Sequence, residues 1–251
     1  MSKKAFILEA CVDSVESAVA AKQGGANRLE LCANLVIGGT TPSLAMFEEV
    51  SRQTGLDVNV LIRPRFGDFC YTADEVKVMC RDIELFKKAG ANGVVFGCLN
   101  ADATVDTQSM KKLRESAGDM FTTMHRAFDV CADPYAALEQ AIELKMNAIL
   151  TSGRKNVCTQ ALDFLADLVK KAGDRIDILE GGITDPTYVK DLIERTGASN
   201  FHLSGHSVFD SPMTVRYDVY MGAPGIAEFE IYRTEADKIN TAYNIIKNNI
   251  K

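Results

Sequence analysis

The chain has 251 residues, of which 47% are hydrophobic and 25% are charged, an ordinary composition for a globular protein. Its net charge of -6 argues against binding to nucleic acid or to an anionic membrane surface. No apolar run approaches the roughly 20 residues of a membrane-spanning helix. The seven cysteines form no C-x-x-C pair, which favours free thiols over a zinc site. Because residues 1–4 lead directly into a strand and resemble no signal peptide, we expect a cytoplasmic protein.

Eight short apolar strands alternate with eight amphipathic helices along the chain. The strands are expected at residues 7–11, 28–32, 58–62, 93–96, 121–125, 148–151, 176–179 and 200–203. Helices are expected to begin at capping residues: Asp13 with Glu16, Pro42 with Ser43, Thr72 with Glu75, Asp133 with Pro134, and Asp185 with Pro186. This rhythm indicates repeated strand–helix units.

Eight such units in about 250 residues predict one (β/α)8 barrel, a TIM barrel, that spans residues 1–251 as a single domain. An open doubly wound sheet is the alternative, but no G-x-G-x-x-G motif follows the first strand. Residues 207–233 form a long insertion between the eighth strand and the last helix, which is expected over about 235–249. An insertion of this length is often a lid or a subunit contact.

An acid and a thiol recur two residues apart in the first two strands. Glu9 and Cys11 share one face of the first strand, and Glu30 and Cys32 share one face of the second. Consecutive strands are neighbours, and active residues of barrels lie at the carboxyl ends of the strands. Two adjacent thiolates suit Cu(I), which prefers soft ligands. The alternative is that both cysteines are small buried hydrophobic residues.

Other polar side chains gather at the remaining strand ends. They are Arg63, Arg65, His125, Arg126, Thr151, Ser152, Glu180, His202 and Ser204. An enzyme could use Glu9, Glu30 and Glu180 as acids and bases, the two histidines as groups that titrate near neutrality, and the first two arginines as anchors for an anion. The alternative is a network of salt bridges that fills the end of the barrel.

Glycines in the last two strand–helix loops suggest a third kind of site. Gly181-Gly182 and Ser204-Gly205 follow the seventh and eighth strands, where barrels often bind phosphate. Glycine lets backbone N–H groups approach an anion. Glu180, directly before the glycine pair, would repel one.

Several stretches together resemble the CutC family, named for copper homeostasis. They are residues 8–11, 25–32, 38–43, 62–71 (Ile-Arg-Pro-Arg-Phe-Gly-Asp-Phe-Cys-Tyr), 125–129 (His-Arg-Ala-Phe-Asp) and 150–153. The chain departs from the family pattern at Glu180, where a glycine is usual. It also departs at Asn200, where a glutamate is usual, and at Leu203, where a small or polar residue is common.

The resemblance implies a cytoplasmic barrel, often oligomeric, with a role in copper tolerance. It also implies Cu(I) binding through Cys11 and Cys32, and His125 is a candidate third ligand. A protein that only carries a metal ion does not need the other polar side chains at the carboxyl ends of the strands, and these side chains suggest a small-molecule site. Under this enzyme alternative the catalytic candidates are Glu9, Glu30, Arg63 and His125, and the substrate-binding candidates are Arg65, Asp129, Thr151, Ser152, His202 and Ser204. We therefore expect a homo-oligomer that binds copper or a small polar or anionic metabolite.

Overall fold

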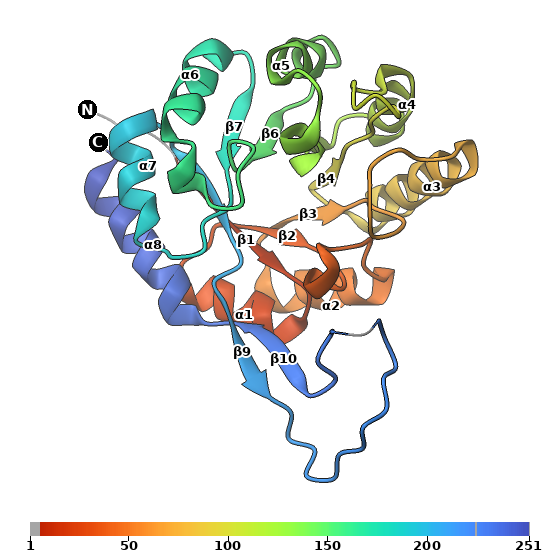
Figure 1. The fold of residues 1–251 in the computed structure, drawn as a ribbon, viewed down its shortest axis with the longest axis vertical. Coiled ribbons are helices and arrows are strands. Elements are labelled where there is room, and N and C mark those ends of the chain that lie inside the picture. The colour runs from red at the N-terminus through yellow and green to blue at the C-terminus, as the bar shows by residue number, and fades with distance from the viewer. Residues whose placement is uncertain (1–5, 224, 251) are drawn as a thin grey trace.

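The computed structural model describes residues 6–223 and 225–250. In it, eight parallel strands close into a barrel surrounded by eight helices (Figure 1). The strands are β1 (Ile7–Val12), β2 (Arg28–Leu31), β3 (Asp57–Leu61), β4 (Gly93–Phe96), β5 (Phe121–Met124), β6 (Ala148–Thr151), β7 (Asp177–Glu180) and β8 (Asn200–Leu203). The helices are α1 (Val15–Gly24), α2 (Leu44–Thr54), α3 (Ala73–Ala89), α4 (Thr107–Ala117), α5 (Pro134–Glu143), α6 (Leu162–Ala172), α7 (Tyr188–Thr196) and α8 (Ala236–Asn249). The predicted (β/α)8 barrel is confirmed.

The helix starts follow the capping residues, with two local differences. Thr72 and Glu75 form the expected reciprocal capping box of α3, and the Asp133 side chain caps α5. The cap of α1 is Ser14, one residue later than expected, and it accepts a hydrogen bond from Ser17 N. Asp185 binds the backbone and hydroxyl of Thr187 in a turn, so α7 begins only at Tyr188.

Each barrel strand is buried on both faces, and the two faces differ in chemistry. The outward faces pack on the helices in one large apolar core. The inner face instead holds a small apolar cluster of Cys11, Cys32, Leu61 and Val95, beside buried polar side chains. In the barrel register Cys11 lies opposite Glu30, and Glu9 lies between Arg28 on β2 and His202 on β8. The inner face therefore carries the candidate site.

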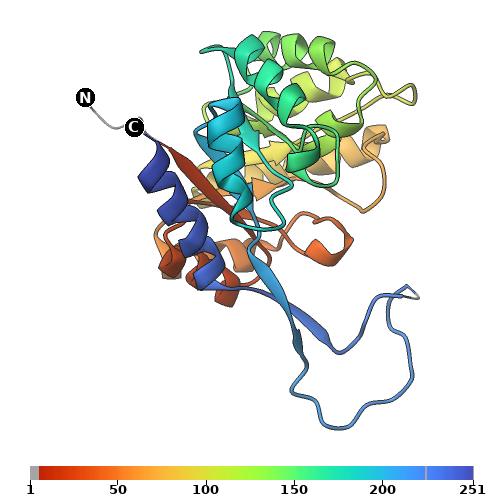
Figure 2. The same ribbon diagram turned by 60° about the vertical axis from the view of Figure 1, so that its left-hand side comes forward.

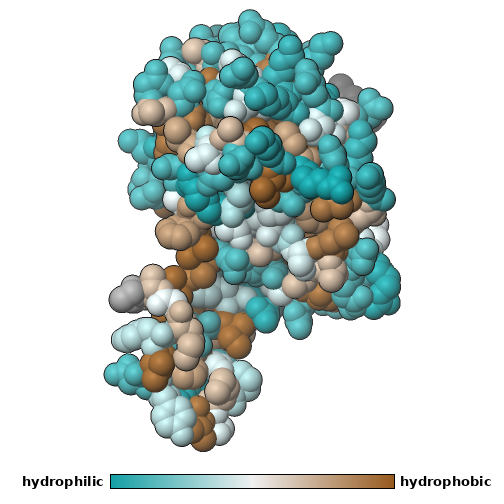
Figure 3. All heavy atoms as spheres, turned by 90° about the vertical axis from the view of Figure 1, so that its right-hand side faces the viewer, coloured by the Kyte–Doolittle hydropathy of each residue, from teal (hydrophilic) through white to brown (hydrophobic). Residues whose placement is uncertain are grey.

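The chain between β8 and α8 leaves the barrel as a hairpin arm. Strands β9 (His206–Asp210) and β10 (Glu230–Thr234) pair antiparallel, and the segment between them extends away from the barrel (Figures 1 and 2). Apolar side chains are exposed along this arm (Figure 3), namely Val208, Phe209, Met213, Val215, Tyr217, Val219, Tyr220 and Met221. The sequence rhythm locates this insertion but does not reveal its paired strands.

Candidate functional site

Buried charges line the inner face where β1 meets β2 and β8. Glu9 is 1% exposed and accepts a hydrogen bond from Arg28 Nε at 2.5 Å. Asn59 Nδ2 lies 3.3 Å from the same oxygen, and His202 Nδ1 lies 2.8 Å from the other. Burial alone would raise the pKa of Glu9, but Arg28 and His202 lower it to about 2. Glu9 is therefore an ionised anchor for its neighbours.

His202 connects the two acids of the inner face. Barrel closure brings it to Glu9 across 193 residues of sequence, and its Nε2 lies 3.6 Å from Glu30 Oε2. Burial alone would lower the pKa of His202, but Cys11, Glu30 and Glu9 raise it well above the ordinary value. An imidazolium here supplies positive charge beside two carboxyl groups and the Cys11 thiol.

Two thiols and one carboxyl group form the compact centre of the site. Cys11 Sγ lies 3.6 Å from Cys32 Sγ and donates to Glu30 Oε2 at 3.0 Å, while Cys32 Sγ lies 3.7 Å from the same oxygen. One ligand atom from each residue lies within 4.8 Å of the others, and all three side chains are buried. This Cys11–Glu30–Cys32 cluster is the one group of metal-ligating side chains found among the described residues. His125 does not belong to it.

Both thiols are held in the neutral form. The hydrogen bond with Cys32, followed by burial, raises the pKa of Cys11 well above its ordinary value. The hydrogen bond with Cys11 lowers the pKa of Cys32, but burial and the Glu30 charge outweigh it and raise that pKa to about 12. Burial also raises the pKa of Glu30. A metal ion must therefore displace protons when it binds these sulfur atoms.

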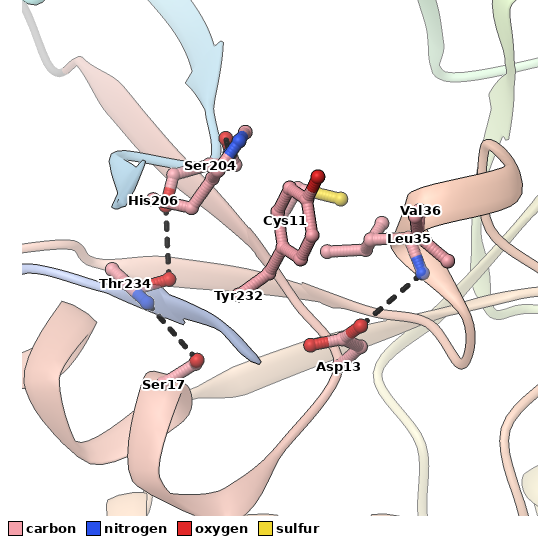
Figure 4. Close-up of a pocket in the computed structure, with 9 residues that line it drawn as sticks. All are labelled: Cys11, Asp13, Ser17, Leu35, Val36, Ser204, His206, Tyr232 and Thr234. Atoms are coloured by element: carbon pink, nitrogen blue, oxygen red, sulfur yellow. Dashed lines mark hydrogen bonds between the residues drawn. The ribbon is translucent and has the colours of Figure 1, made fainter. Parts of the chain in front are cut away.

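Cavities lie against the cluster on two sides. A cavity of about 170 Å³ is lined by Cys11, Glu30, Cys32, Leu35, Gly38, Leu61, Arg63, Phe69, His125, Arg126, Leu150 and His202. A second cavity of about 240 Å³ (Figure 4) is lined by Cys11, Asp13, Ser17, Leu35, Val36, Ser204, His206, Tyr232 and Thr234. Cys11 borders both, so a small ligand reaches its sulfur through either.

The base of the hairpin arm forms one wall of the second cavity. His206 from β9 and Tyr232 from β10 line it, and Ser204 Oγ lies 2.6 Å from His206 Nδ1. Thr234 fastens this wall, since its N–H donates to Ser17 Oγ and its hydroxyl donates to the Ser204 carbonyl (Figure 4). The insertion thus contributes directly to the surroundings of Cys11.

His125 is a neutral donor at the edge of the smaller cavity. Its Nδ1 accepts the Ala127 N–H, so Nε2 carries the proton, and that nitrogen is buried without a hydrogen-bond partner in the described part of the chain. Burial and the Arg63 charge lower the pKa of His125 to about 3. The expectation that the two histidines titrate near neutrality is therefore wrong, because one is held neutral and the other charged.

Arg63 holds two loops together at the mouth. Its Nη1 donates to the carbonyl oxygens of Gly38 and Gly39 at 3.1 and 2.9 Å, and its Nη2 donates to that of Gly67 at 2.6 Å. The guanidinium also lies over the Phe69 ring, 5.1 Å from its centroid. All four of these contacts lie in loops beside the cavity, so Arg63 shapes its wall.

We expect Arg63→Ala to lower the free energy of unfolding by about 2 kcal/mol, because several charge-assisted hydrogen bonds to carbonyl oxygens are lost together. Urea unfolding of the two proteins measures the difference. The matched control is Arg52→Ala, since Arg52 is exposed on α2 and should leave the midpoint unchanged. Equal unfolding midpoints for Arg63→Ala and the native chain would contradict the structural role.

Arg65 does not bind as an anchor for an anionic ligand, because its guanidinium contacts acceptors of the protein itself. It donates to Glu75 Oε1 at 2.6 Å and to Asp68 Oδ1 at 2.9 Å, and it also binds the Cys70 carbonyl oxygen. It is absent from the lining of the cavities around Cys11. These contacts join the loop after β3 to the start of α3.

Asp129, Thr151 and Ser152 form one closed hydrogen-bond network. The Asp129 carboxylate accepts the Thr151 hydroxyl at 2.5 Å, the Ser152 N–H and hydroxyl, and the Arg154 N–H. Arg126 Nε donates to it at 2.7 Å. With its acceptor sites filled in this way, Asp129 positions Arg126, and neither it nor its two hydroxyl partners lines the cavities around Cys11.

Sequence reasoning missed two residues of the site and placed a third, Arg126, at a strand end without giving it a role. Arg28 and Asn59 face Glu9 from the strands, and Arg126 lines the smaller cavity beside His125. Alternation from Glu30 back to Arg28 could have placed the first on the inner face. Arg126 was expected at the end of the fifth strand, but its direction could not be predicted, because it depends on the turn at residues 126–130 that follows β5.

Glu180 does not join the other acids. Its register partners are Thr151 and Phe201, and it lies on the outward face of β7, fully buried near Thr196 of α7. Neither carboxyl oxygen has a hydrogen-bond partner among residues 6–223 and 225–250. Burial raises the pKa of Glu180 to about 8, against a smaller opposing effect of Thr196. Its expected acid–base role and its expected repulsion of anions at the mouth are both wrong.

The fold and this site together define a (β/α)8 barrel with a thiol–carboxylate cluster at its carboxyl-end mouth. The CutC family model matches residues 6–207, so the chain belongs to the CutC family. A CutC-family protein of Parabacteroides distasonis is 44% identical over 236 residues, which cover 93% of this chain and 97% of that protein. A human protein, named copper homeostasis protein cutC homolog, is 41% identical over 245 residues, which cover 97% of this chain and 90% of that protein.

A solved CutC structure from Streptococcus agalactiae has the same architecture. It superposes with a TM-score of 0.76 at 28% identity and covers 80% of this chain and 99% of its own. None of the helices in the described residues is both long and apolar enough to cross a membrane. The family match ends at residue 207, so α8 and all of the arm after its first two residues lie beyond it.

Proposed function

We propose that the chain binds Cu(I) through Cys11 and Cys32 and serves in copper homeostasis. The observation that carries this proposal is the pair of thiols 3.6 Å apart at the barrel mouth, with the Glu30 carboxyl group as the third donor of the cluster. Thiolates are the ligands that Cu(I) prefers, and it accepts low coordination numbers. Zn²⁺ usually takes four ligands in a structural site. The human relative's name supports the same role.

The surroundings of the cluster suit two thiolates. His202 lies next to Cys11 and Glu30, and Arg28 lies behind it on Glu9. These cations offset the negative charge that remains when one Cu(I) ion replaces two thiol protons. The cavity of about 170 Å³ gives the ion a route to both sulfur atoms. His125, the earlier candidate for a third ligand, stays at the edge of this cavity.

The enzymatic alternative has less support. A general acid or base works best with a pKa near the working pH. Glu9 is held ionised by Arg28 with a pKa of about 2, and His125 is held neutral with a pKa of about 3. Arg63 and Arg65 are occupied by loop carbonyls and acids. Proton transfer at neutral pH is therefore poorly served by Glu9 and His125, and Glu30, whose pKa burial raises, is the acid–base candidate that remains.

Titration of the reduced protein with Cu(I) against a chromophoric chelator, under argon, tests the proposal. One equivalent of Cu(I) per chain should remain bound to the protein in the presence of the chelator.

We assign the activity to the cytoplasm, because thiolate ligation requires reduced cysteines. A homo-oligomer stays a prediction that the exposed apolar arm supports, and a light-scattering mass of a single chain would contradict it.

A further inference from the structure

The largest cavity beside Cys11 differs from the others in the charge of its walls. It measures about 400 Å³ and lies between the loop after β7, the loop after β8 and the start of α8. Arg126, His202 and Lys238 line it, and no aspartate or glutamate does. In a chain with a net charge of -6, a wall of cations without acids is selective for an anion.

Two of the three side-chain cations at this wall, Arg126 and Lys238, are held in place by partners outside the cavity lining. Arg126 is fixed by Asp129 through Nε and by Ser152 through Nη2, while none of the hydrogen bonds of the described residues uses its Nη1. Lys238 Nζ contacts the Glu235 carboxylate at 3.0 Å, the His206 carbonyl oxygen at 2.9 Å and the Ser207 hydroxyl at 2.5 Å. The paired acids lie outside the lining. Arg126 Nη1 is left as a donor in the described part of the chain, whereas Lys238, whose three N–H groups have partners, contributes its positive charge.

Backbone donors complete the wall. Gly182 and Gly205 line the cavity, and since they have no side chains, they present backbone to it. The N–H groups of Gly182, Ile183 and Thr184 donate to no acceptor within the described part of the chain. Gly182 has a φ of +72°, and a Cβ there would meet Ser152 Cβ at 2.6 Å, so this turn requires glycine.

We propose that this cavity binds the phosphoryl group of a small phosphorylated metabolite. Free backbone N–H groups in a glycine turn, an arginine fork and a lysine are the donor set that phosphate oxygens prefer. The loops after the seventh and eighth strands are where (β/α)8 barrels place such sites. Glu180, which stood against this reading, faces the helix layer on the other side of β7.

The same cavity reaches the thiol cluster. Cys11, Arg126 and His202 line both it and the smaller cavity that holds Cys32. A phosphate ester anchored at Lys238 therefore extends its other end towards Cys11. The phosphoryl site does not depend on copper, since its donors lie outside the Cys11–Glu30–Cys32 cluster.

Isothermal titration of the whole chain with inorganic phosphate and with glycerol 1-phosphate tests the site. Both should bind saturably, and Lys238→Gln and Arg126→Gln should each raise the dissociation constant by about tenfold or more, as expected for a lost charge-assisted hydrogen bond. The matched control is Lys77→Gln, because Lys77 is an exposed lysine on α3. Tighter binding of the ester identifies a metabolite, and equal binding identifies free phosphate as the ligand.

Three results would overturn this site. They are no saturation by either phosphate at about 10 mM, a dissociation constant unchanged in both variants, or acetate binding as tight as phosphate. Circular dichroism spectra show whether the variants are folded. If Arg126→Gln does not fold, Lys238→Gln alone tests the site. The Cys32→Ser protein should bind phosphate as the native chain does, because Cys32 does not line this cavity, and this separates failure here from failure of copper binding.

Discussion

Replacing Cys11 and Cys32 together by serine is expected to weaken Cu(I) binding by more than about 100-fold. Loss of a residue that only orients a metal ligand already costs about 10–100-fold in affinity, and this variant removes both thiolates. Serine oxygen is a hard ligand that Cu(I) does not prefer. Competition with a chromophoric Cu(I) chelator measures the difference. Glu30→Gln keeps both sulfur atoms and should weaken binding by no more than about 100-fold.

The chain offers a matched control for the thiol count. Cys70 is exposed and Cys80 is partly buried, and both lie outside the Cys11–Glu30–Cys32 cluster. The Cys70→Ser/Cys80→Ser protein should therefore compete for Cu(I) as well as the native chain. Equal weakening in the two double variants would assign the copper to cysteines in general and would contradict a site at the mouth.

Glu180→Gln is expected to stabilise the fold, increasingly so as the pH rises. The carboxyl group is fully buried with a pKa of about 8, compared with an ordinary value of 4.5. Below pH 4.5 the group is neutral in both folded and unfolded chains and does not affect stability. Between 4.5 and 8 the unfolded chain loses this proton first, so the native free energy of unfolding falls by about 1.4 kcal/mol per pH unit. Glutamine removes this loss, which totals roughly 3–5 kcal/mol at pH 8.

Urea unfolding of both proteins at pH 5 and pH 8 measures this effect. The difference in unfolding free energy between Glu180→Gln and the native chain should be small at pH 5 and near its maximum at pH 8. Glu115→Gln, at an exposed position on α4, is the control and should follow the native chain. A difference independent of pH would show that Glu180 is not held neutral by burial.

The barrel follows from local chemistry that can be read along the chain. Short apolar strands and capped amphipathic helices alternate eight times, and each of the eight barrel strands lies within one residue of its expected bounds. The acid-x-thiol pattern also places Glu9, Cys11, Glu30 and Cys32 on one face correctly, because strand neighbours follow from strand order. The arrangement of thiols beside a carboxyl group was thus accessible from sequence.

Contacts across the closed barrel were not accessible in the same way. His202 meets Glu9 only because β8 pairs with β1. Barrel strands are buried on both faces, so hydrophobic alternation does not distinguish inside from outside. Glu180 shows the consequence. A difference of one residue along β7 decides whether a side chain faces the barrel mouth or the helix layer, and Glu180 faces the helix layer. Arg63 and Arg126 were expected at strand ends, but their hydrogen-bond partners depend on the geometry of the turns and could not be predicted from periodicity.

X-ray absorption at the copper K edge of the Cu(I)-loaded chain tests the central claim most directly. A copper ion held by Cys11 and Cys32 should show two sulfur neighbours in the native protein and none in the Cys11→Ser/Cys32→Ser protein loaded in the same way. Copper surrounded by nitrogen or oxygen in the native protein, or a sulfur shell that persists in the double variant, would contradict thiolate binding at the barrel mouth.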